Sequence, residues 1–206
     1  MQEAETKRGD AQVGEVIKKF FFRSNFGHDY VKDFEQRFLF KARNPIGTGW
    51  EELDAITHQG LGQGELGVVI APTGAGKSMA LVHIGAQALK AGKNVVYYTL
   101  ELSETVVGSR FDSCITNVPL NDLKDFKEEI YEKVQMIEGQ LIVKEYPTKS
   151  ASCQTLKNHV EKLMTRGFKP DMILVDYGDL LRPISTLREK RHELETIYEQ
   201  LRAISQ

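Results

Sequence analysis

The sequence predicts an α/β fold in which a mostly parallel β-sheet is covered by helices on both faces. Two observations lead to this prediction: apolar segments alternate with amphipathic ones, and the apolar segments are nearly free of polar residues. Short, nearly continuous apolar runs alternate along the chain with longer segments that repeat apolar residues at helical spacing. Because such strands have no polar side, both of their faces must be buried, which is typical of parallel sheets between helices.

The expected elements follow one another through a core domain at residues 45–206. A short helix at residues 50–56 is closed by Gly60, Gly92 is placed to end the first long helix, and Ser103 is placed to cap the next one. We expect strands at residues 66–70, 94–99, 140–144 and 172–176. We expect further helices at residues 77–91, 103–117, 120–134, 152–166 and 191–205.

The residues ahead of this core form an appendage. Residues 1–15 are charged and expected to be flexible, whereas residues 16–44 are rich in aromatic side chains and expected to form a linker helix region. Tyr30, Phe34 and Phe38 recur every four residues, which places them on one face of a helix. The pattern leaves two alternatives open, because this face can pack on the chain's own core or on a neighbouring subunit.

A glycine-rich loop at residues 71–78, Ala-Pro-Thr-Gly-Ala-Gly-Lys-Ser, joins the first expected strand to the first long helix. Gly74 and Gly76 allow the backbone to turn its N–H groups inward, where they can hold phosphate oxygens at a helix start. Lys77 would reach the β- and γ-phosphates, and the Ser78 hydroxyl would hold Mg²⁺. The strand–loop–helix context indicates nucleoside triphosphate binding rather than a chance glycine-rich turn. The expected nucleotide-binding residues are Ala71, Pro72, Thr73, Gly74, Ala75, Gly76, Lys77, Ser78 and Met79.

An acid ends the last expected strand. Residues 172–175 are apolar, and Asp176 follows them at the carboxyl end of the strand, the edge where parallel sheets bind ligands. A carboxylate at this edge can hold Mg²⁺ through a water, together with Ser78. We expect this role for Asp176; a helix cap or a turn is the alternative.

Hydrolysis also needs a group that polarises the attacking water, besides the charge that Lys77 brings to the phosphates. Glu101 follows the strand at residues 94–99 and should emerge at the same sheet edge. We therefore expect Glu101 and Lys77 to be the catalytic residues. The alternative for Glu101 is an acid at a helix start, although Glu104, directly after the cap Ser103, fits that alternative better.

The composition narrows the classes of partner and compartment. The formal net charge is −2 over 206 residues, so any surface for nucleic acid must be local. Two cysteines, Cys114 and Cys153, lack metal-ligand spacing, which is typical of reduced thiols in a cytosolic protein. No apolar run approaches membrane-spanning length, and the charged start lacks the apolar core of a signal peptide. We expect a soluble, cytoplasmic protein.

Several stretches resemble a known family. Those at the expected site are Gly-Lys-Ser at residues 76–78, Leu-Glu-Leu at residues 100–102 and Val-Asp-Tyr at residues 175–177. Together they resemble the RecA-type ATPase core of the DnaB-class replicative DNA helicases, and residues 46–54, Ile-Gly-Thr-Gly-Trp-Glu-Glu-Leu-Asp, resemble the approach to that core. Within the class, two further stretches resemble the helicases of large tailed phages. They are Gly-His-Asp-Tyr at residues 27–30 and Leu-Ile-Val-Lys-Glu-Tyr-Pro-Thr at residues 141–148.

This resemblance implies a RecA-type phosphate-loop NTPase core, which works in a hexameric ring around single-stranded DNA. Such proteins hydrolyse ATP or GTP with Mg²⁺ to translocate and to unwind duplex DNA. The implied partners are a primase, a helicase loader and a single-strand-binding protein. For the aromatic face of Tyr30, Phe34 and Phe38 the resemblance favours packing on a neighbouring subunit. A phage origin would place the protein in the cytoplasm of the host cell.

Two parts of the family plan have no counterpart in the chain. No N-terminal collar domain precedes residue 16, and the chain stops at Gln206, before the part that carries a polar sensor and an arginine finger in the family. The chain is therefore expected to be a fragment, truncated at the C-terminus and weakly active alone. Four basic residues after Asp176 form either a DNA-contacting loop in the ring or an ordinary solvated loop and helix start: Arg182, Arg188, Lys190 and Arg191.

Three functions remain in competition at this point. The first is a hexameric helicase motor, which the resemblance favours. The second is a RecA- or RadA-like recombination ATPase that forms filaments on single-stranded DNA, because the same loop and acids would serve it. The third is a nucleotide-binding regulatory fragment without turnover, which the absence of an arginine finger supports. A ring or a filament by electron microscopy separates the first two, and turnover excludes the third.

Overall fold

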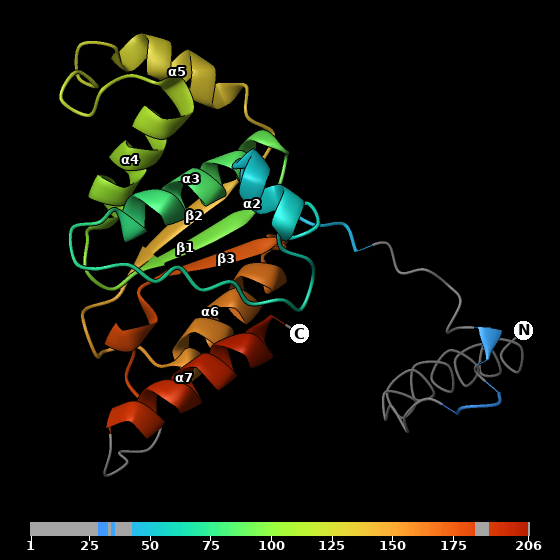
Figure 1. The fold of residues 1–206 in the computed structure, drawn as a ribbon. Helices are drawn as coiled ribbons and strands as arrows, with labels where there is room; N and C mark the ends of the chain where they lie inside the picture. Colours follow the sequence, from blue (N-terminus) through green and yellow to red (C-terminus); the bar gives the residue numbers. More distant parts are fainter. Residues whose placement is uncertain (1–28, 33, 36–42, 184–189, 206) are drawn as a thin grey trace, which may run out of the picture. The chain divides into compact units, whose positions relative to one another are not determined.

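A parallel sheet of three strands is the centre of the described structure (Figure 1). This computed structural model describes residues 29–32, 34–35, 43–183 and 190–205. The chain divides into two units, Met1–Ala42 and Arg43–Gln206, and the sheet belongs to the second unit. The α/β class that the sequence predicts is confirmed.

The carboxyl ends of the three strands lie at the same edge of the sheet. They are β1 (Val95–Thr99), β2 (Leu141–Glu145) and β3 (Met172–Asp176), in the spatial order β2-β1-β3 with both pairings parallel. Thr99 lies opposite Glu145 on one side and opposite Asp176 on the other. All residues of β1 are buried, because this strand has a neighbour on each side and helices on each face.

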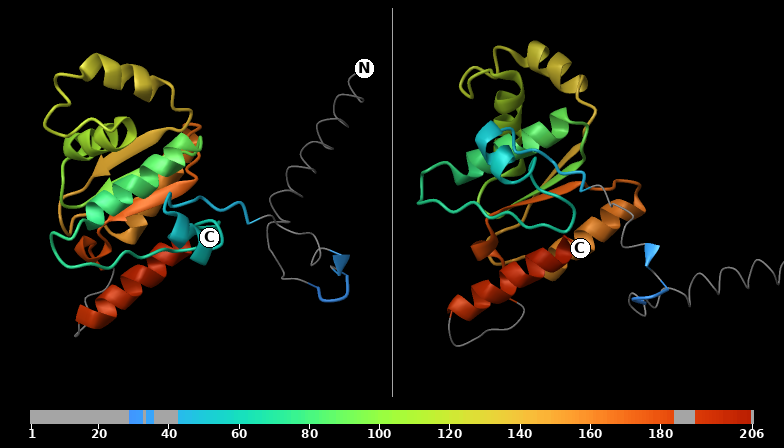
Figure 2. Two further views of the ribbon diagram at one scale, coloured as in Figure 1. Left: turned by 45° about the horizontal axis from the view of Figure 1, so that its top comes forward. Right: turned by 45° about the vertical axis from the view of Figure 1, so that its right-hand side comes forward.

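Helices cover both faces of the sheet, as the sequence predicts (Figure 1, Figure 2). Those on one face are α3 and α4, and those on the other are α6 and α7. None of the helices in the described part of the chain is long and apolar enough to cross a membrane. The described helices are α2 (Glu51–Ile56), α3 (Lys77–Lys90), α4 (Glu104–Thr116), α5 (Lys127–Gln135), α6 (Cys153–Thr165), the short 3₁₀ helix η2 (Gly178–Leu180) and α7 (Lys190–Ile204).

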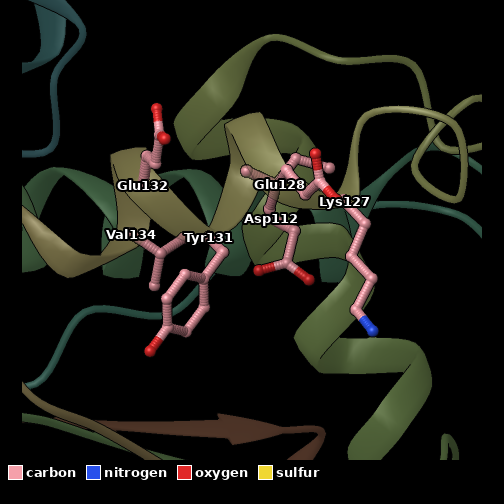
Figure 3. Close-up of a pocket in the computed structure, with 7 residues that line it drawn as sticks. Asp112, Lys127, Glu128, Tyr131, Glu132 and Val134 are labelled. Atoms are coloured by element: carbon pink, nitrogen blue, oxygen red, sulfur yellow. The ribbon is translucent and has the colours of Figure 1, made fainter.

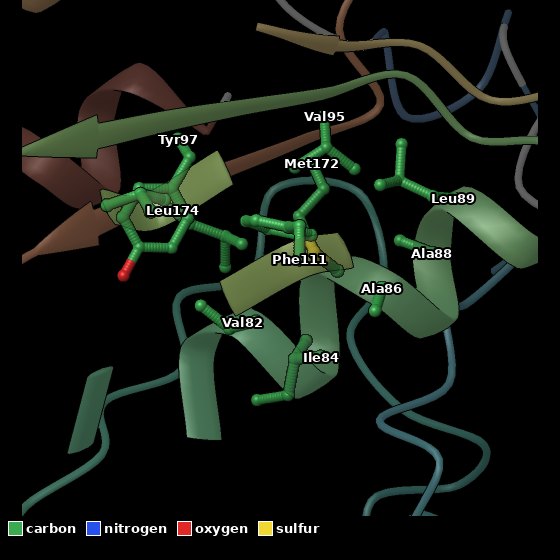
Figure 4. Close-up of a cluster of buried hydrophobic side chains, with 11 residues drawn as sticks. Val82, Ile84, Ala86, Ala88, Leu89, Val95, Tyr97, Phe111, Met172 and Leu174 are labelled. Atoms are coloured by element: carbon green, nitrogen blue, oxygen red, sulfur yellow. The ribbon is translucent and has the colours of Figure 1, made fainter. Parts of the chain in front are cut away.

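An apolar cluster on each face holds the layers together. Successive side chains of β1 alternate between them: Val95 and Tyr97 belong to the first cluster, and Val96 and Tyr98 to the second. The first cluster, shown in Figure 4, adds side chains of α3, α4 and β3: Val82, Ile84, Ala86, Ala88, Leu89, Val107, Phe111, Met172 and Leu174. The second cluster adds Leu100, Ala151, Cys153, Leu156, Leu181 and Ile197.

The strand expected at residues 66–70 is wrong. This segment pairs with no strand of the described residues, and Ile70 at its end is 90% exposed. An apolar run becomes a strand only when a neighbour completes its backbone hydrogen bonds and covers its side chains. Within the described chain no strand pairs with the outer edge of β3, and residues 66–70 do not add to that edge.

The helix expected at residues 120–134 begins later, at Lys127 of α5. Turns occupy the residues before it, where Asp122 N–H donates to Pro119 O and Asp125 N–H donates to Asp122 O. Aspartate and asparagine favour such turns because their side chains compete for backbone hydrogen bonds. By contrast, α4 begins where expected, with the Ser103 hydroxyl accepting a hydrogen bond from Val106 N–H at 3.3 Å.

The segment before the glycine-rich loop is tied to α3. Asp54 accepts hydrogen bonds from the N–H and hydroxyl of Thr48 and from Gly49 N–H. These bonds, that from Thr48 N–H above all, lower the pKa of Asp54. The turn places Trp50 against His83 of α3, with the two rings stacked at a centroid distance of 4.4 Å. The Thr-Gly-Trp stretch therefore helps to hold the helix that begins at the loop.

The aromatic stretch of the first unit is only partly described. Tyr30 and Phe34 lie in turns rather than in the predicted helix, and Phe38 lies outside the described residues. The carboxylate of Asp29 accepts hydrogen bonds from the N–H groups of Val31 and Lys32. Such side-chain bonds offer the backbone an alternative to helix, which explains the turn at this point.

Candidate nucleotide-binding site

The loop at residues 71–78 leads into α3 at the end of the sheet toward which the strands point (Figure 1, Figure 2). Gly74 and Gly76 have φ values of 78° and 94°, in the region that side chains disfavour. A Cβ at either position would meet no atom within 4 Å. The backbone conformation, rather than crowding, therefore explains why these two positions are glycine.

The start of α3 has no side-chain cap. Gly76 is the N-cap, and the first helical hydrogen bond runs from Ala80 N–H to Gly76 O at 2.9 Å. The backbone N–H groups of Lys77, Ser78 and Met79 consequently have no partner within the helix. The first turn carries no acidic side chain, so its N–H groups and the helix dipole suit an anion such as a phosphate.

Lys77 lies across the loop. Its ammonium donates hydrogen bonds to Ala71 O at 2.8 Å and to Pro72 O at 3.1 Å. Both partners are neutral carbonyls at the start of the loop, so they orient the ammonium without cancelling its charge. A cation held in this way can form charge-assisted hydrogen bonds with phosphate oxygens.

Asp176, the last residue of β3, is 1% exposed. Its Oδ2 accepts a hydrogen bond from the Tyr97 hydroxyl at 2.9 Å, the only hydrogen bond to this carboxylate from the described residues. Burial first, and then the charge of Asp176, raise the pKa of Tyr97 far above its ordinary value, so the phenol keeps the proton that it donates.

Glu101 is exposed in the bend that follows β1. The residue before it, Leu100, donates its N–H to Asp176 O at 2.9 Å, which joins the ends of the two strands. The Thr99 hydroxyl donates to Leu102 O and accepts from Leu102 N–H, which fixes the shape of the bend. The two acids singled out from the sequence thus lie at the same edge of the sheet.

The donor chemistry of this edge suits magnesium. Across the described residues no group of three or more His, Cys, Asp and Glu side chains gathers into a metal site. At a nucleotide, however, Mg²⁺ usually takes only one or two protein oxygens, and waters and phosphate oxygens supply the rest. A buried carboxylate at Asp176 and a hydroxyl at Ser78, in the first turn of α3, are the kind of protein ligands that this pattern requires.

The basic residues expected to contact DNA follow β3 along the chain. Arg182 is exposed, and its backbone N–H donates to Ala151 O at 2.8 Å. Lys190 and Arg191 are exposed at the start of α7. Arg188 lies outside the described residues. A role of these residues in DNA binding stays a prediction.

A separate pocket of about 570 Å³ lies between α4 and α5 (Figure 3). None of the residues expected to bind nucleotide lines it, and burial raises the pKa of Asp112 on its α4 side. The pocket is therefore distinct from the loop at the start of α3. Its lining residues are Asp112, Lys127, Glu128, Ile130, Tyr131, Glu132 and Val134.

Sequence reasoning did not single out Tyr97, whose hydroxyl contacts Asp176. A signal was present, because a strand expected to be buried on both faces carries the consecutive residues Tyr97 and Tyr98. Buried hydroxyls need hydrogen-bond partners. Alternation along the strand could have shown that these two hydroxyls go to opposite faces of the sheet, but not which partners they find.

Two solved structures share this fold. A DnaB-like replicative helicase, described with its interactions with primase, aligns with a TM-score of 0.66 at 15% identity, over 98% of this chain and 52% of that one. A second solved structure, described as an ATPase domain, aligns with a TM-score of 0.65 at 14% identity, over 85% of this chain and 64% of that one. At these identities the likeness shows the fold class, which is that of the RecA-type ATPase domains.

The sequence places the chain within a family. Residues 45–206 match the DnaB-like helicase C-terminal domain, and the chain belongs to that family. A DnaB-like replicative helicase of Enterobacteria phage T4 is 33% identical over 199 residues, 89% of this chain and 42% of the relative. The replicative DNA helicase DnaB of Leifsonia xyli subsp. xyli (strain CTCB07) is 25% identical over 173 residues, 78% of this chain and 36% of the relative.

The chain therefore spans less than half the length of these two relatives. The resemblance to DnaB-class helicases, with a phage helicase among the relatives, is confirmed.

Proposed function

We propose that the chain is the nucleotide-hydrolysing motor domain of a hexameric replicative DNA helicase, which translocates on single-stranded DNA and unwinds duplex DNA. The observation that carries the proposal is the glycine-rich loop at the uncapped start of α3, in a chain of the DnaB-like helicase C-terminal domain family. Family membership supports a helicase over a filament-forming recombination ATPase.

Each residue of the site has a role in this proposal. The loop and helix start at residues 71–79 hold the phosphates of ATP or GTP, through the backbone N–H groups of every residue except Pro72 and through the ammonium of Lys77. Ser78 and Asp176 hold Mg²⁺, which neutralises charge on the β- and γ-phosphates when it is bound. Glu101, exposed beside the end of β3, accepts a proton from the attacking water.

The partners belong to the same proposal. Arg182, Arg188, Lys190 and Arg191 contact the phosphates of single-stranded DNA, and Tyr30, Phe34 and Phe38 pack on a neighbouring subunit of the ring. A primase, a helicase loader and a single-strand-binding protein act with the ring in the cytoplasm. A solved relative whose description includes interactions with primase supports the first of these three.

A lysine exchange tests the nucleotide site. Lys77→Ala removes the ammonium that faces the phosphates, so we expect Mg-nucleotide affinity to fall about 10- to 100-fold, as for loss of a charged hydrogen bond, and hydrolysis to be lost. Fluorescent-nucleotide titration and steady-state turnover measure the two effects. Lys90→Ala, at the other end of the same helix, is the matched control and should bind as the unchanged chain does. Equal affinity of all three chains would refute the assignment of the loop.

A further inference from the structure

Two consecutive tyrosines of the central strand bury hydroxyls on opposite faces of the sheet. Tyr97 and Tyr98 are both 0% exposed. The Tyr98 hydroxyl lies 2.9 Å from His159 Nδ1 and 3.3 Å from Leu156 O, on the face that α6 covers. The Tyr97 hydroxyl donates to Asp176 at 2.9 Å, on the face that α3 covers. Only Tyr97 of this pair therefore contacts a residue of the candidate site.

The register of the strands explains this contact. Tyr97 lies opposite Leu174 of β3, and Asp176 is two residues further along β3 on the same face. Diagonal neighbours of this kind are about 7–8 Å apart at their Cα atoms, which a tyrosine side chain can span. Phe111 of α4 holds the ring edge-on at a centroid distance of 5.7 Å, and Figure 4 shows the ring beside Leu174. The hydroxyl is therefore fixed in place by packing.

The neutral character of the donor matters for the chemistry of Asp176. A lysine or arginine in the same place would cancel the negative charge of the carboxylate and compete with a metal ion. A phenol satisfies one carboxylate oxygen and leaves the charge for a cation. The Tyr97 hydroxyl engages Oδ2, and no described residue donates a hydrogen bond to Oδ1, which is therefore available to a metal ion or its water.

We propose that Tyr97 is a positioning residue, which orients the carboxylate of Asp176 for Mg²⁺ at the bound nucleotide. This inference rests on the proposed function, in which Asp176 holds Mg²⁺. Partners that orient a metal-binding side chain commonly affect metal affinity or activity by about 10- to 100-fold. Since the metal contact of Asp176 is expected to pass through a water, the low end of this range applies.

The test compares two hydroxyl deletions at adjacent positions. Tyr97→Phe and Tyr98→Phe each remove one buried hydroxyl from β1, and only the first removes a contact with Asp176. The dissociation constant of a fluorescent, non-hydrolysable ATP analogue is measured for each chain in Mg²⁺ and in EDTA. The ratio of the two constants is the gain in affinity that the metal brings. We expect Tyr97→Phe to reduce this gain about tenfold and to leave the constant in EDTA unchanged.

Tyr98→Phe should keep the full gain in affinity that Mg²⁺ brings. Thermal unfolding of both variants shows whether the chains are folded. Two further side chains at position 97 separate the proton from the packing. Tyr97→4-fluorophenylalanine fills the space of the hydroxyl without a donor and should lose the gain, even where a cavity would unfold the phenylalanine variant. Tyr97→4-aminophenylalanine keeps an N–H donor and should restore the gain.

The outcomes distinguish this inference from the proposed function. If the unchanged chain gains nothing from Mg²⁺, the metal site of the proposed function is refuted, and the role of Tyr97 with it. If the unchanged chain gains affinity and the 4-fluorophenylalanine variant keeps that gain, only the role of Tyr97 is refuted. An equal loss in Tyr98→Phe would also refute it, because the loss would then follow from any buried hydroxyl of β1.

Discussion

The two acids at the sheet edge lie in opposite environments. Asp176 is buried and accepts a hydrogen bond from Tyr97, whereas Glu101 is exposed in a bend two residues past the end of β1. A buried carboxylate with a fixed partner is organised before a metal ion arrives. An exposed carboxylate can adjust to a water molecule in front of the phosphates. These environments support the division of roles in the proposed function.

The role of Glu101 is open to a direct test. Glu101→Gln keeps the shape of the side chain but cannot take a proton, so nucleotide should still bind while turnover falls by about a hundredfold or more. Binding and steady-state turnover in the presence of single-stranded DNA measure this separation. Glu104→Gln is the control, since its carboxylate accepts hydrogen bonds from the Lys144 ammonium and from Glu145 N–H. Turnover that survives in the Glu101 variant would place the base elsewhere.

At the scale of the elements, Gly139, in the connection before β2, packs closely against backbone atoms of the chain. A Cβ on Gly139 would lie 2.5 Å from Lys93 O and 2.7 Å from Leu89 O. Both atoms are backbone, at the end of α3 and in the turn that leads to β1, so they cannot move aside as a flexible side chain would. By contrast, a Cβ on Gly108, inside α4, would meet no atom within 4 Å.

These two glycines predict opposite effects of the same substitution. Gly139→Ala should destabilise the fold by about 1–3 kcal/mol, the usual cost of overpacking. Gly108→Ala should stabilise it by about 0.5–1 kcal/mol, because alanine favours helix and the site has room. Urea unfolding of the two variants measures both free energies. Stabilisation by Gly139→Ala would show that the backbone contacts are not as close as described.

For the molecule as a whole, the apolar segment at residues 66–70 presents an exposed surface. Leu66, Val68, Val69 and Ile70 are 39%, 51%, 41% and 90% exposed. Contiguous apolar surface of this kind marks contact sites or promotes association. The nucleotide loop begins directly after it, so whatever covers the segment also borders the proposed site.

Replacing part of this surface should change association without changing stability. We expect Val68→Thr with Ile70→Thr to lower the binding of a hydrophobic dye and the concentration-dependent association of the chain, measured by fluorescence and by sedimentation. The melting temperature should change little, because exposed substitutions usually alter stability by about 0.5 kcal/mol or less. Val82→Thr, at a fully buried position, is the control and should lower the melting temperature. A large loss of stability in the double variant would mean that the segment is buried in solution.

Sequence alone was sufficient for the features that depend on neighbouring residues. The paired strands, α3, α4, α6 and α7 lie within a few residues of their expected positions, because apolar periodicity and caps such as Ser103 are local signals. The glycine-rich loop and the family were also evident from short motifs. The turns before α5 were missed, since an aspartate-rich stretch can follow either helix or turn chemistry.

Tertiary structure decided what depends on residues far apart in the chain. The segment at residues 66–70 has strand composition but no partner among the described strands, and a strand exists only through hydrogen bonds to a neighbour. The contact between Tyr97 and Asp176 joins residues 79 positions apart, through the register of β1 against β3. Residue type determines that such a hydroxyl needs a partner, and only the pairing of the strands determines which partner it meets.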